Sequence, residues 1–275
     1  MNTLRAISTL RRDLTVGRLV HRVLLAGAVA LFTYSLLAGQ PWARLAAFGL
    51  VTAYFALTVW SLRSARITGE AARLIAAGRH DEAEDRVQQA VRRFGVVKPI
   101  KLATLHQLAV LRHAQGRWPE AVAAGGAFLR QTGASPMTSA AQLLVAEAAL
   151  ASDDLPAAHR ALVALRGQPL GTDHFAAVLL LELDYQSRLG LWEPMVHNKK
   201  AKLETLDLRP GKDAALGSAL IALAQAKLGV DDGGAALSER AGLLADPATL
   251  VEERPLLGAV LKTDVDGFGG ADKGD

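Results

Sequence analysis

The sequence predicts an all-α protein in which an N-terminal pair of membrane-spanning helices is followed by a stack of about five helix pairs. Three observations lead to this prediction. The 275 residues are 51% hydrophobic but only 5% aromatic, and Ala and Leu, which are strong helix formers, dominate. Two long uncharged runs lie near the start of the chain, and beyond residue 67 a turn pattern recurs at a regular step.

The two uncharged runs cover residues 23–39 and 45–62. Each is close to the roughly 17–25 residues that a helix needs to cross a bilayer. The link between them, residues 40–44, is short and contains a proline, which suits a tight helical hairpin. We therefore expect a basic cytosolic segment at 1–18 and a transmembrane hairpin at 19–62, through which the protein contacts the membrane.

Small residues within the two runs favour close packing of the spans. Ala26 and Ala30 are four residues apart on the first run, and Gly49 and Ala53 are four apart on the second. Two alternatives remain for this region. It could be a buried hairpin of a soluble protein, or its first run could belong to a cleaved signal peptide.

The distribution of charge predicts orientation and excludes one class of partner. Residues 1–66 hold eight arginines and one aspartate, hence +7; the whole chain carries +4, so residues 67–275 carry −3. A mildly acidic main domain argues against nucleic-acid binding. The positive charges flank the runs, and the positive-inside rule places both termini in the cytoplasm. The chain has no cysteine, which excludes disulfides, thiolate metal sites and cysteine nucleophiles.

The rest of the chain repeats a turn that begins at positions 78, 116, 153, 190 and 229, with steps of 38, 37, 37 and 39 residues. Such a period is typical of stacked supersecondary units. Glycine at four of the five positions predicts a left-handed helix C-cap. Prolines that suit the first turn of the following helix come soon afterwards, at Pro119, Pro156 and Pro194.

The best-matching unit reads LAVLRHAQGRWPEAVA, residues 108–123, with small or turn residues at Ala109, Gly116 and Ala121. These units resemble tetratricopeptide repeats over residues 67–248. The resemblance implies a TPR-like right-handed α-solenoid with a concave face that binds protein partners. A generic helical bundle is the alternative. The layout, two spans and then repeats, is also similar to that of bacterial inner-membrane tetratricopeptide proteins.

In the tetratricopeptide family the first helix of each unit supplies the partner contacts. By this analogy the exposed groove positions are His106, Val110, His113, Glu147, Asp184 and Ser187. The Lys and Asn set with which the family clamps chaperone tails is not present at these positions. A second candidate surface is a basic patch at Lys199, Lys200 and Lys202, which could face lipid headgroups.

No pattern in the sequence predicts catalysis, a cofactor, a metal or a small-molecule substrate. His106 and His113 are seven residues apart, too far along a helix for a shared metal. There is no phosphate-binding glycine motif and no nucleophile elbow. The Gly125–Gly126 pair falls inside a predicted helix, where it favours close packing.

After the repeats we expect a capping helix from residue 249 and a disordered tail within 249–275. Thr249 and Glu252 have the spacing of a capping box, and Pro255 would kink or shorten the helix.

The sequence therefore predicts a membrane-anchored scaffold or adaptor, and no enzyme. An accessory subunit of a membrane complex, held mainly through Gly49 and Ala53 in the bilayer, is the first alternative. An enzyme with an unrecognised site is the second.

Overall fold

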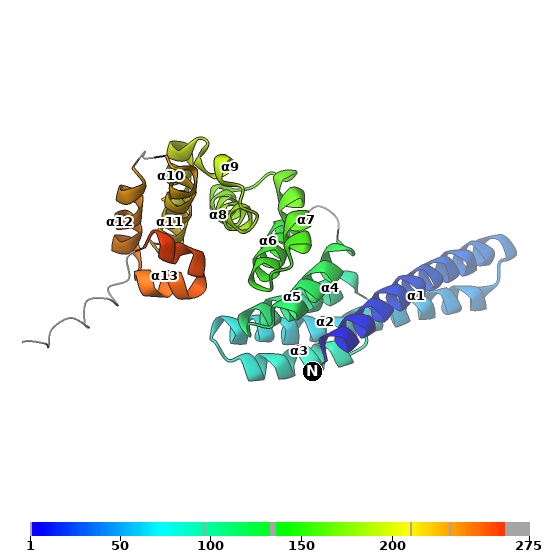
Figure 1. The fold of residues 1–275 in the computed structure, drawn as a ribbon. Helices are drawn as coiled ribbons and strands as arrows, with labels where there is room; N and C mark the ends of the chain where they lie inside the picture. The colour runs from blue at the N-terminus through cyan, green and yellow to red at the C-terminus, as the bar shows by residue number, and fades with distance from the viewer. Residues whose placement is uncertain (1, 96, 133–135, 210, 231–232, 262–275) are drawn as a thin grey trace, which may run out of the picture. The chain divides into compact units, whose positions relative to one another are not determined.

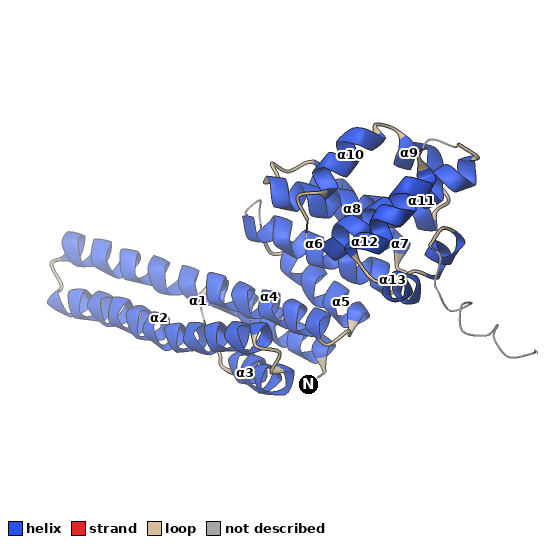
Figure 2. Ribbon diagram, turned by 90° about the vertical axis from the view of Figure 1, so that its left-hand side faces the viewer, coloured by secondary structure: helices blue, strands red, loops and turns tan. Residues whose placement is uncertain are grey.

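A computed structural model of the chain describes residues 2–95, 97–132, 136–209, 211–230 and 233–261. These residues form thirteen α-helices and one short 3-10 helix, and none of them lies in a strand (Figures 1 and 2). The predicted all-α class is confirmed. The chain divides into two compact units, Met1–Ser152 and Asp153–Asp275, which are described separately below.

The first two helices are long and continuous. Helix α1 spans Thr3–Ala38 and helix α2 spans Pro41–Ala76, so both run past the predicted limits of the hairpin. Gly39, at a φ of 64°, ends α1, and Pro41 begins α2. The most apolar window of each helix is only 6% and 11% buried. These are two helices that could span a membrane, and their exposure distinguishes them from the core helices of a soluble protein.

The contact face inside the hairpin differs from the one we expected. Ala26, Ala30, Gly49 and Ala53 are all exposed. The spans meet instead through Gly27, where an added Cβ would lie 3.3 Å from Leu50 Cδ1, and through the buried Ala43 and Ala47. A helix turns by about 100° per residue, so Ala26 faces away from α2 although Gly27, the next residue, faces it. The spacing of small residues does not determine which side of a helix faces its neighbour.

The five predicted turns are present. Their first residues all have positive φ: Gly78 (71°), Gly116 (69°), Asp153 (57°), Gly190 (69°) and Gly229 (67°). At Gly116 the N–H donates to His113 O at 2.9 Å and the next N–H donates to Arg112 O at 2.8 Å, which is the Schellman arrangement. The same pair of bonds occurs at the other three glycine turns. At the third turn Asp154 caps the next helix by accepting from Ala157 N.

Unit 1 contains the first two turns and the helix before the third. Its further helices are α3 (His80–Arg92), α4 (Lys98–Ala114), α5 (Trp118–Leu129) and α6 (Pro136–Ala151). Helices α2, α4 and α6 pack side by side in chain order, while α3 and α5 each contact the helix before and after them. The first part of α1 lies against α2, α3, α4 and α5, and the far end of the α1–α2 hairpin projects beyond them (Figures 1 and 2).

Unit 2 contains the remaining turns. Its helices are α7 (Leu155–Arg166), α8 (Thr172–Arg188), α9 (Trp192–Val196), α10 (Lys199–Leu206), α11 (Gly211–Leu228), α12 (Gly234–Leu244) and α13 (Pro247–Glu253), followed by the 3-10 helix η1 (Pro255–Ala259). The helix after the fourth turn is broken between α9 and α10, where Asn198 has a φ of 53°. Asn tolerates this left-handed conformation better than most residues. The hydrophobic core of unit 2 includes Met195, Leu206 and the small buried residues of α11.

The expected capping box is wrong. Asp246, three residues before Thr249, is the N-cap of α13: its side chain accepts from Ala248 N at 3.2 Å and from the Thr249 hydroxyl at 2.9 Å. Pro247 occupies the first helical position, and the helix ends before Pro255. Residues 262–275, which contain the predicted tail, lie outside the described residues.

Alanine at the two adjacent glycines of α5 is predicted to change stability in opposite directions. A Cβ at Gly125 would lie 2.4 Å from Val145 Cγ2 of α6, whereas a Cβ at Gly126 would meet only the flexible end of Arg130, at 3.5 Å. We expect Gly125→Ala to lower the free energy of unfolding by about 1–3 kcal/mol through overpacking. Gly126→Ala should raise it by about 0.5–1 kcal/mol, because alanine restricts the unfolded chain. Urea unfolding followed by circular dichroism measures both, and equal effects would contradict the packing of α5 on α6.

Candidate membrane junction and interaction surface

The first part of α1 belongs to the core of unit 1. Ala6, Ile7, Leu10 and Leu14 are buried in one cluster with the apolar faces of α3, α4 and α5. Leu10 is 0% exposed, whereas Leu4, on the other side of the helix, is 70% exposed. The segment expected as a basic cytosolic N-terminus is therefore an amphipathic helix whose apolar side is covered by the repeats.

A buried ion pair joins α1 to α4. Asp13 Oδ2 lies 2.8 Å from Lys101 Nζ, and the two residues are 3% and 1% exposed. Lys101 Nζ also donates to Arg93 O, at the end of α3. An ammonium and a carboxylate removed from water are tolerated when each meets the other with good geometry. The pair fixes where α1 crosses the start of α4.

A second polar cluster surrounds Arg112, which is fully buried near the end of α4. Its guanidinium donates to Glu84 of α3 at 2.8 and 3.1 Å, to Gln115 at 2.6 Å and to the Thr3 hydroxyl of α1 at 2.9 Å. Thr3 in turn donates to Glu120 of α5. The hydrogen bonds from Arg112 hold the pKa of Glu84 far below its ordinary value. One side chain thus links four helices.

A pattern in the sequence indicates that these two cations are buried. Lys101 and Arg112 share a helix face with Leu105 and Leu108, since the spacings of 4, 3 and 4 residues follow the period of an α-helix. A charged residue at a core position of an apolar face indicates a buried partner. The partner of Lys101 is Asp13, the one acidic residue among residues 1–66, and the carboxylate partners of Arg112 are Glu84 and Glu120.

Four of the predicted groove residues lie in unit 1, on α4 and α6. His106, Val110 and His113 are partly exposed, and Glu147 is exposed. His113 Nε2 lies 3.3 Å from Glu147 Oε2, so these faces of α4 and α6 adjoin. His106 packs edge-on against Phe128, with ring centroids 5.3 Å apart, and His113 packs similarly against Trp118 at 5.0 Å. Four of the six proposed positions therefore lie on two neighbouring helices.

The other two predicted groove residues are in unit 2 and are not exposed. Asp184 and Ser187 are 3% and 4% exposed. Asp184 accepts two hydrogen bonds from Arg254, at 3.0 and 2.7 Å, and two from Arg188, at 3.2 and 3.5 Å. Its carboxylate therefore holds Arg254, the residue that follows α13, against α8. Our expectation that both residues line an open surface is wrong, because both are part of the packing of unit 2.

The predicted basic patch is only partly free. Lys200 is exposed. Lys202 is partly buried, and its Nζ donates to Pro194 O and, at 3.2 Å, to Met195 O at the break between α9 and α10. Burial lowers the pKa of Lys202. Lys202 therefore holds the broken helix together, which removes it from the proposed lipid-facing set.

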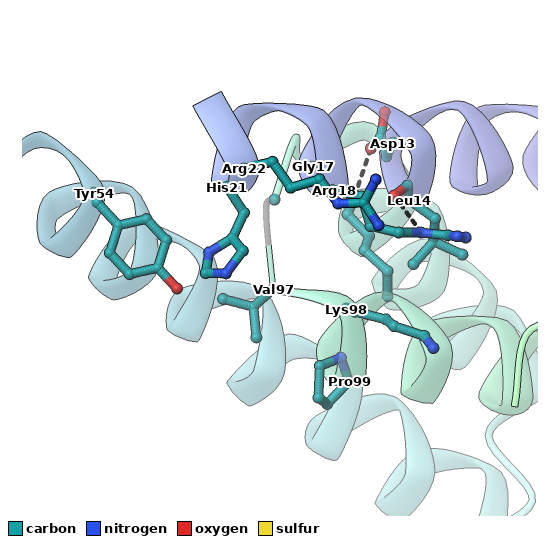
Figure 3. A pocket seen from close by; sticks show the side chains of 12 residues that line it. Asp13, Leu14, Gly17, Arg18, His21, Arg22, Tyr54, Val97, Lys98 and Pro99 are labelled. Atoms are coloured by element: carbon teal, nitrogen blue, oxygen red, sulfur yellow. Dashed lines mark hydrogen bonds and ion pairs between the residues drawn. The ribbon is translucent and has the colours of Figure 1, made fainter. Parts of the chain in front are cut away.

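A basic cavity of about 270 Å³ lies between α1, α2 and the start of α4, beside the helices that pack around the first part of α1. Figure 3 shows its lining, which comes from α1, α2 and the start of α4 and includes Arg18, Arg22 and Lys98. The ring of His21 lies beside that of Tyr54, with centroids 5.2 Å apart. The sequence placed these arginines at a membrane boundary but gave no sign that they surround a cavity.

Comparisons with known proteins give no relatives for this chain. No family model matches it, and neither a curated protein nor a solved structure is significantly similar. Among the residues that the structure describes, no three His, Asp or Glu side chains gather where they could hold a metal ion.

Breaking the buried ion pair should strongly destabilise unit 1. Asp13→Asn leaves Lys101 charged and without its carboxylate, and we expect a loss of about 3–5 kcal/mol in unfolding free energy. Adding Lys101→Met to Asp13→Asn should recover part of that loss, because the unpaired charge is removed. The matched control is Arg11→Gln, two residues before Asp13 and exposed, which should change stability by less than about 0.5 kcal/mol. Urea unfolding of the full chain in mild detergent gives all four values. A loss no larger than that of the control would contradict the assignment.

His106 should make stability fall in acid. Burial lowers its pKa below the ordinary 6.5, so the unfolded chain takes up a proton at a higher pH than the folded chain does. Its contribution is complete above about pH 6.5 and is lost as the pH falls below that value. In His106→Gln the drop in melting temperature between pH 7.5 and 5.5 should be smaller than in the parent protein. His174→Gln, at an exposed histidine, should leave that drop unchanged; identical behaviour of the two variants would refute the prediction.

Proposed function

We propose that the protein is a membrane-anchored scaffold, with tetratricopeptide-like repeats, that binds a protein partner at the cytosolic face of a membrane. The observation that carries this proposal is the continuity of α1 and α2. Each helix is apolar and exposed over one part and packed into the repeats over the other. The same two helices thus form the candidate anchor and part of the core of unit 1.

The helix pairs of each unit support the scaffold part of the proposal. In unit 1 the first helices α2, α4 and α6 are neighbours, and in unit 2 α8 and α11 are neighbours. Stacked first helices are the arrangement that creates a binding face in helical-repeat proteins. In unit 1 this face presents Val110, His113 and Glu147 to solvent in part or in full. Such a mixed face suits a partner segment that carries both apolar and basic groups.

The orientation follows from the charges at the two ends of the hairpin. Arg18, Arg22 and Arg63 lie toward the repeats, whereas Arg44 is the one arginine near the hairpin tip. The positive-inside rule therefore supports cytoplasmic repeats and cytoplasmic termini. By analogy of layout we extend the proposal to a bacterial inner membrane, and to a binding protein that catalyses no reaction.

One observation favours a second candidate, an accessory subunit held mainly within the bilayer. Ala26, Ala30, Gly49 and Ala53 are exposed on the hairpin. Small residues spaced by four favour close helix packing in membranes, and these four are not used inside the hairpin. They are available to a helix of another membrane protein.

Site-specific photocrosslinking in native membranes distinguishes the two candidates. A photoreactive amino acid is placed in the full chain at Val110 or Glu147 for the repeat face, at Ala53 for the hairpin, and at the exposed Asp85 of α3 as a control. The scaffold proposal predicts that Val110 and Glu147 capture the same protein and that Asp85 captures none. The fragment 67–275 is unsuitable, because it lacks Leu10 and Asp13 and would expose the core of unit 1.

The two candidate functions predict different crosslinking patterns. A protein crosslinked from Ala53 but from neither repeat position would replace the scaffold proposal with the accessory-subunit one. Equal crosslinking from Asp85 and Val110 would show a non-specific surface and would count against a dedicated binding face.

A further inference from the structure

The cavity at the junction between the apolar spans and unit 1 has an excess of positive charge. Arg18, Arg22, Lys98 and Lys101 line it, and Asp13 is the acidic residue in its lining. Lys101 is already paired with Asp13 at 2.8 Å. Three cations therefore remain without a carboxylate in the lining.

Two of these cations have no partner within the described part of the chain. Arg18 donates to Gln131 at 2.8 Å and to Leu14 O at 3.3 Å. For Arg22 and Lys98, by contrast, no side-chain hydrogen bond or ion pair is formed with any described residue, and both are exposed. Two unpaired cations from different helices, α1 and the start of α4, thus share one concave site (Figure 3).

The cavity lies where the uncharged run of α1 ends. Arg22 is the last charged residue before the uncharged run 23–39, and Tyr54, in the middle of the α2 run 45–62, contacts His21 at the same height. On α2, Trp60 lies under the Arg63 guanidinium, 5.4 Å from ring to charge, and it is six residues, about 9 Å, farther from the hairpin tip than Tyr54. Long cationic side chains at the end of a span extend to the headgroups. The open cations can therefore reach the headgroups for a chain inserted through its apolar helices.

We propose that this cavity binds the phosphate of an anionic membrane lipid, with Arg22 and Lys98 as the principal phosphate ligands and Arg18 supporting them. The volume of about 270 Å³ equals that of about nine water molecules at ~30 Å³ each, which is room for a headgroup without its acyl chains. The chains would lie along the exposed apolar surface of the hairpin. The inference rests on the proposed membrane anchoring.

The test compares two double variants of the full chain. Arg22→Gln/Lys98→Gln removes the open cations of the cavity. Arg11→Gln/Arg66→Gln removes the same charge from exposed positions on α1 and α2 outside the cavity. Short-chain phosphatidylglycerol or phosphatidylcholine is titrated into each detergent-solubilised protein, and bound lipid is counted by native mass spectrometry. Inorganic phosphate is titrated in a parallel arm, and alkaline carbonate extraction of membranes reports anchoring separately.

We expect the parent and the control variant to bind one phosphatidylglycerol in preference to phosphatidylcholine. The cavity variant should bind it about 30-fold more weakly, at roughly fivefold for each cation. All three proteins should resist carbonate extraction. Equal phosphatidylglycerol binding by the two variants, with anchoring intact, would overturn the lipid site alone. Inorganic phosphate binding as tightly as the lipid would assign the cavity to a soluble anion instead. Extraction of the parent protein by carbonate would overturn the anchoring and the lipid site together.

Discussion

The burial of the first part of α1 in unit 1 is the constraint on which the arrangement of that unit depends. Leu10 and its apolar neighbours fill a space bounded by α3, α4 and α5. Without them the apolar faces of these helices would be exposed to water, at about 25 cal/mol for each Å². Because the same helix continues into the apolar hairpin, the helical core of unit 1 and the candidate membrane spans share one helix.

Apolar contacts alone would not determine the register of α1 along α4. The two polar contacts fix it at separate points: Asp13 meets Lys101 near the start of α4, and Thr3 meets Arg112 near its end. The intervals are ten residues on α1 and eleven on α4, about 15 and 16 Å at 1.5 Å per residue. The two helices therefore run antiparallel with matched spacing. Buried ionic groups contribute little net stability, but any other register of α1 would leave Lys101 without its carboxylate partner and Arg112 without its hydrogen bond to Thr3.

The sequence predicted the features that depend on local backbone chemistry. Glycine at positions 78, 116, 190 and 229 indicated left-handed caps, and the four Schellman turns follow from that property alone. Prediction failed where the rotation of a helix or a distant partner decides the outcome. Ala53 and Asp184 were placed on the wrong faces because a helix face is defined only by what packs against it. The capping box at Thr249 failed because α13 begins at Pro247, so the N-cap position falls on Asp246 and Thr249 lies inside the helix.

The cations of unit 1 fall into two groups: those that a carboxylate of the protein neutralises, and those that remain unpaired within the described residues. Some positive charge in unit 1 is neutralised internally, as Lys101 is by Asp13 and Arg112 is by Glu84. The described acidic residues near the hairpin junction are too few to neutralise the rest, since residues 1–66 contain a single aspartate and the buried pair already uses it. Arg22 and Lys98 consequently face outward at the level where the apolar surface begins. In the proposed membrane setting, anionic headgroups would supply the counter-charge, because the carboxylate in the cavity lining, Asp13, is already paired with Lys101.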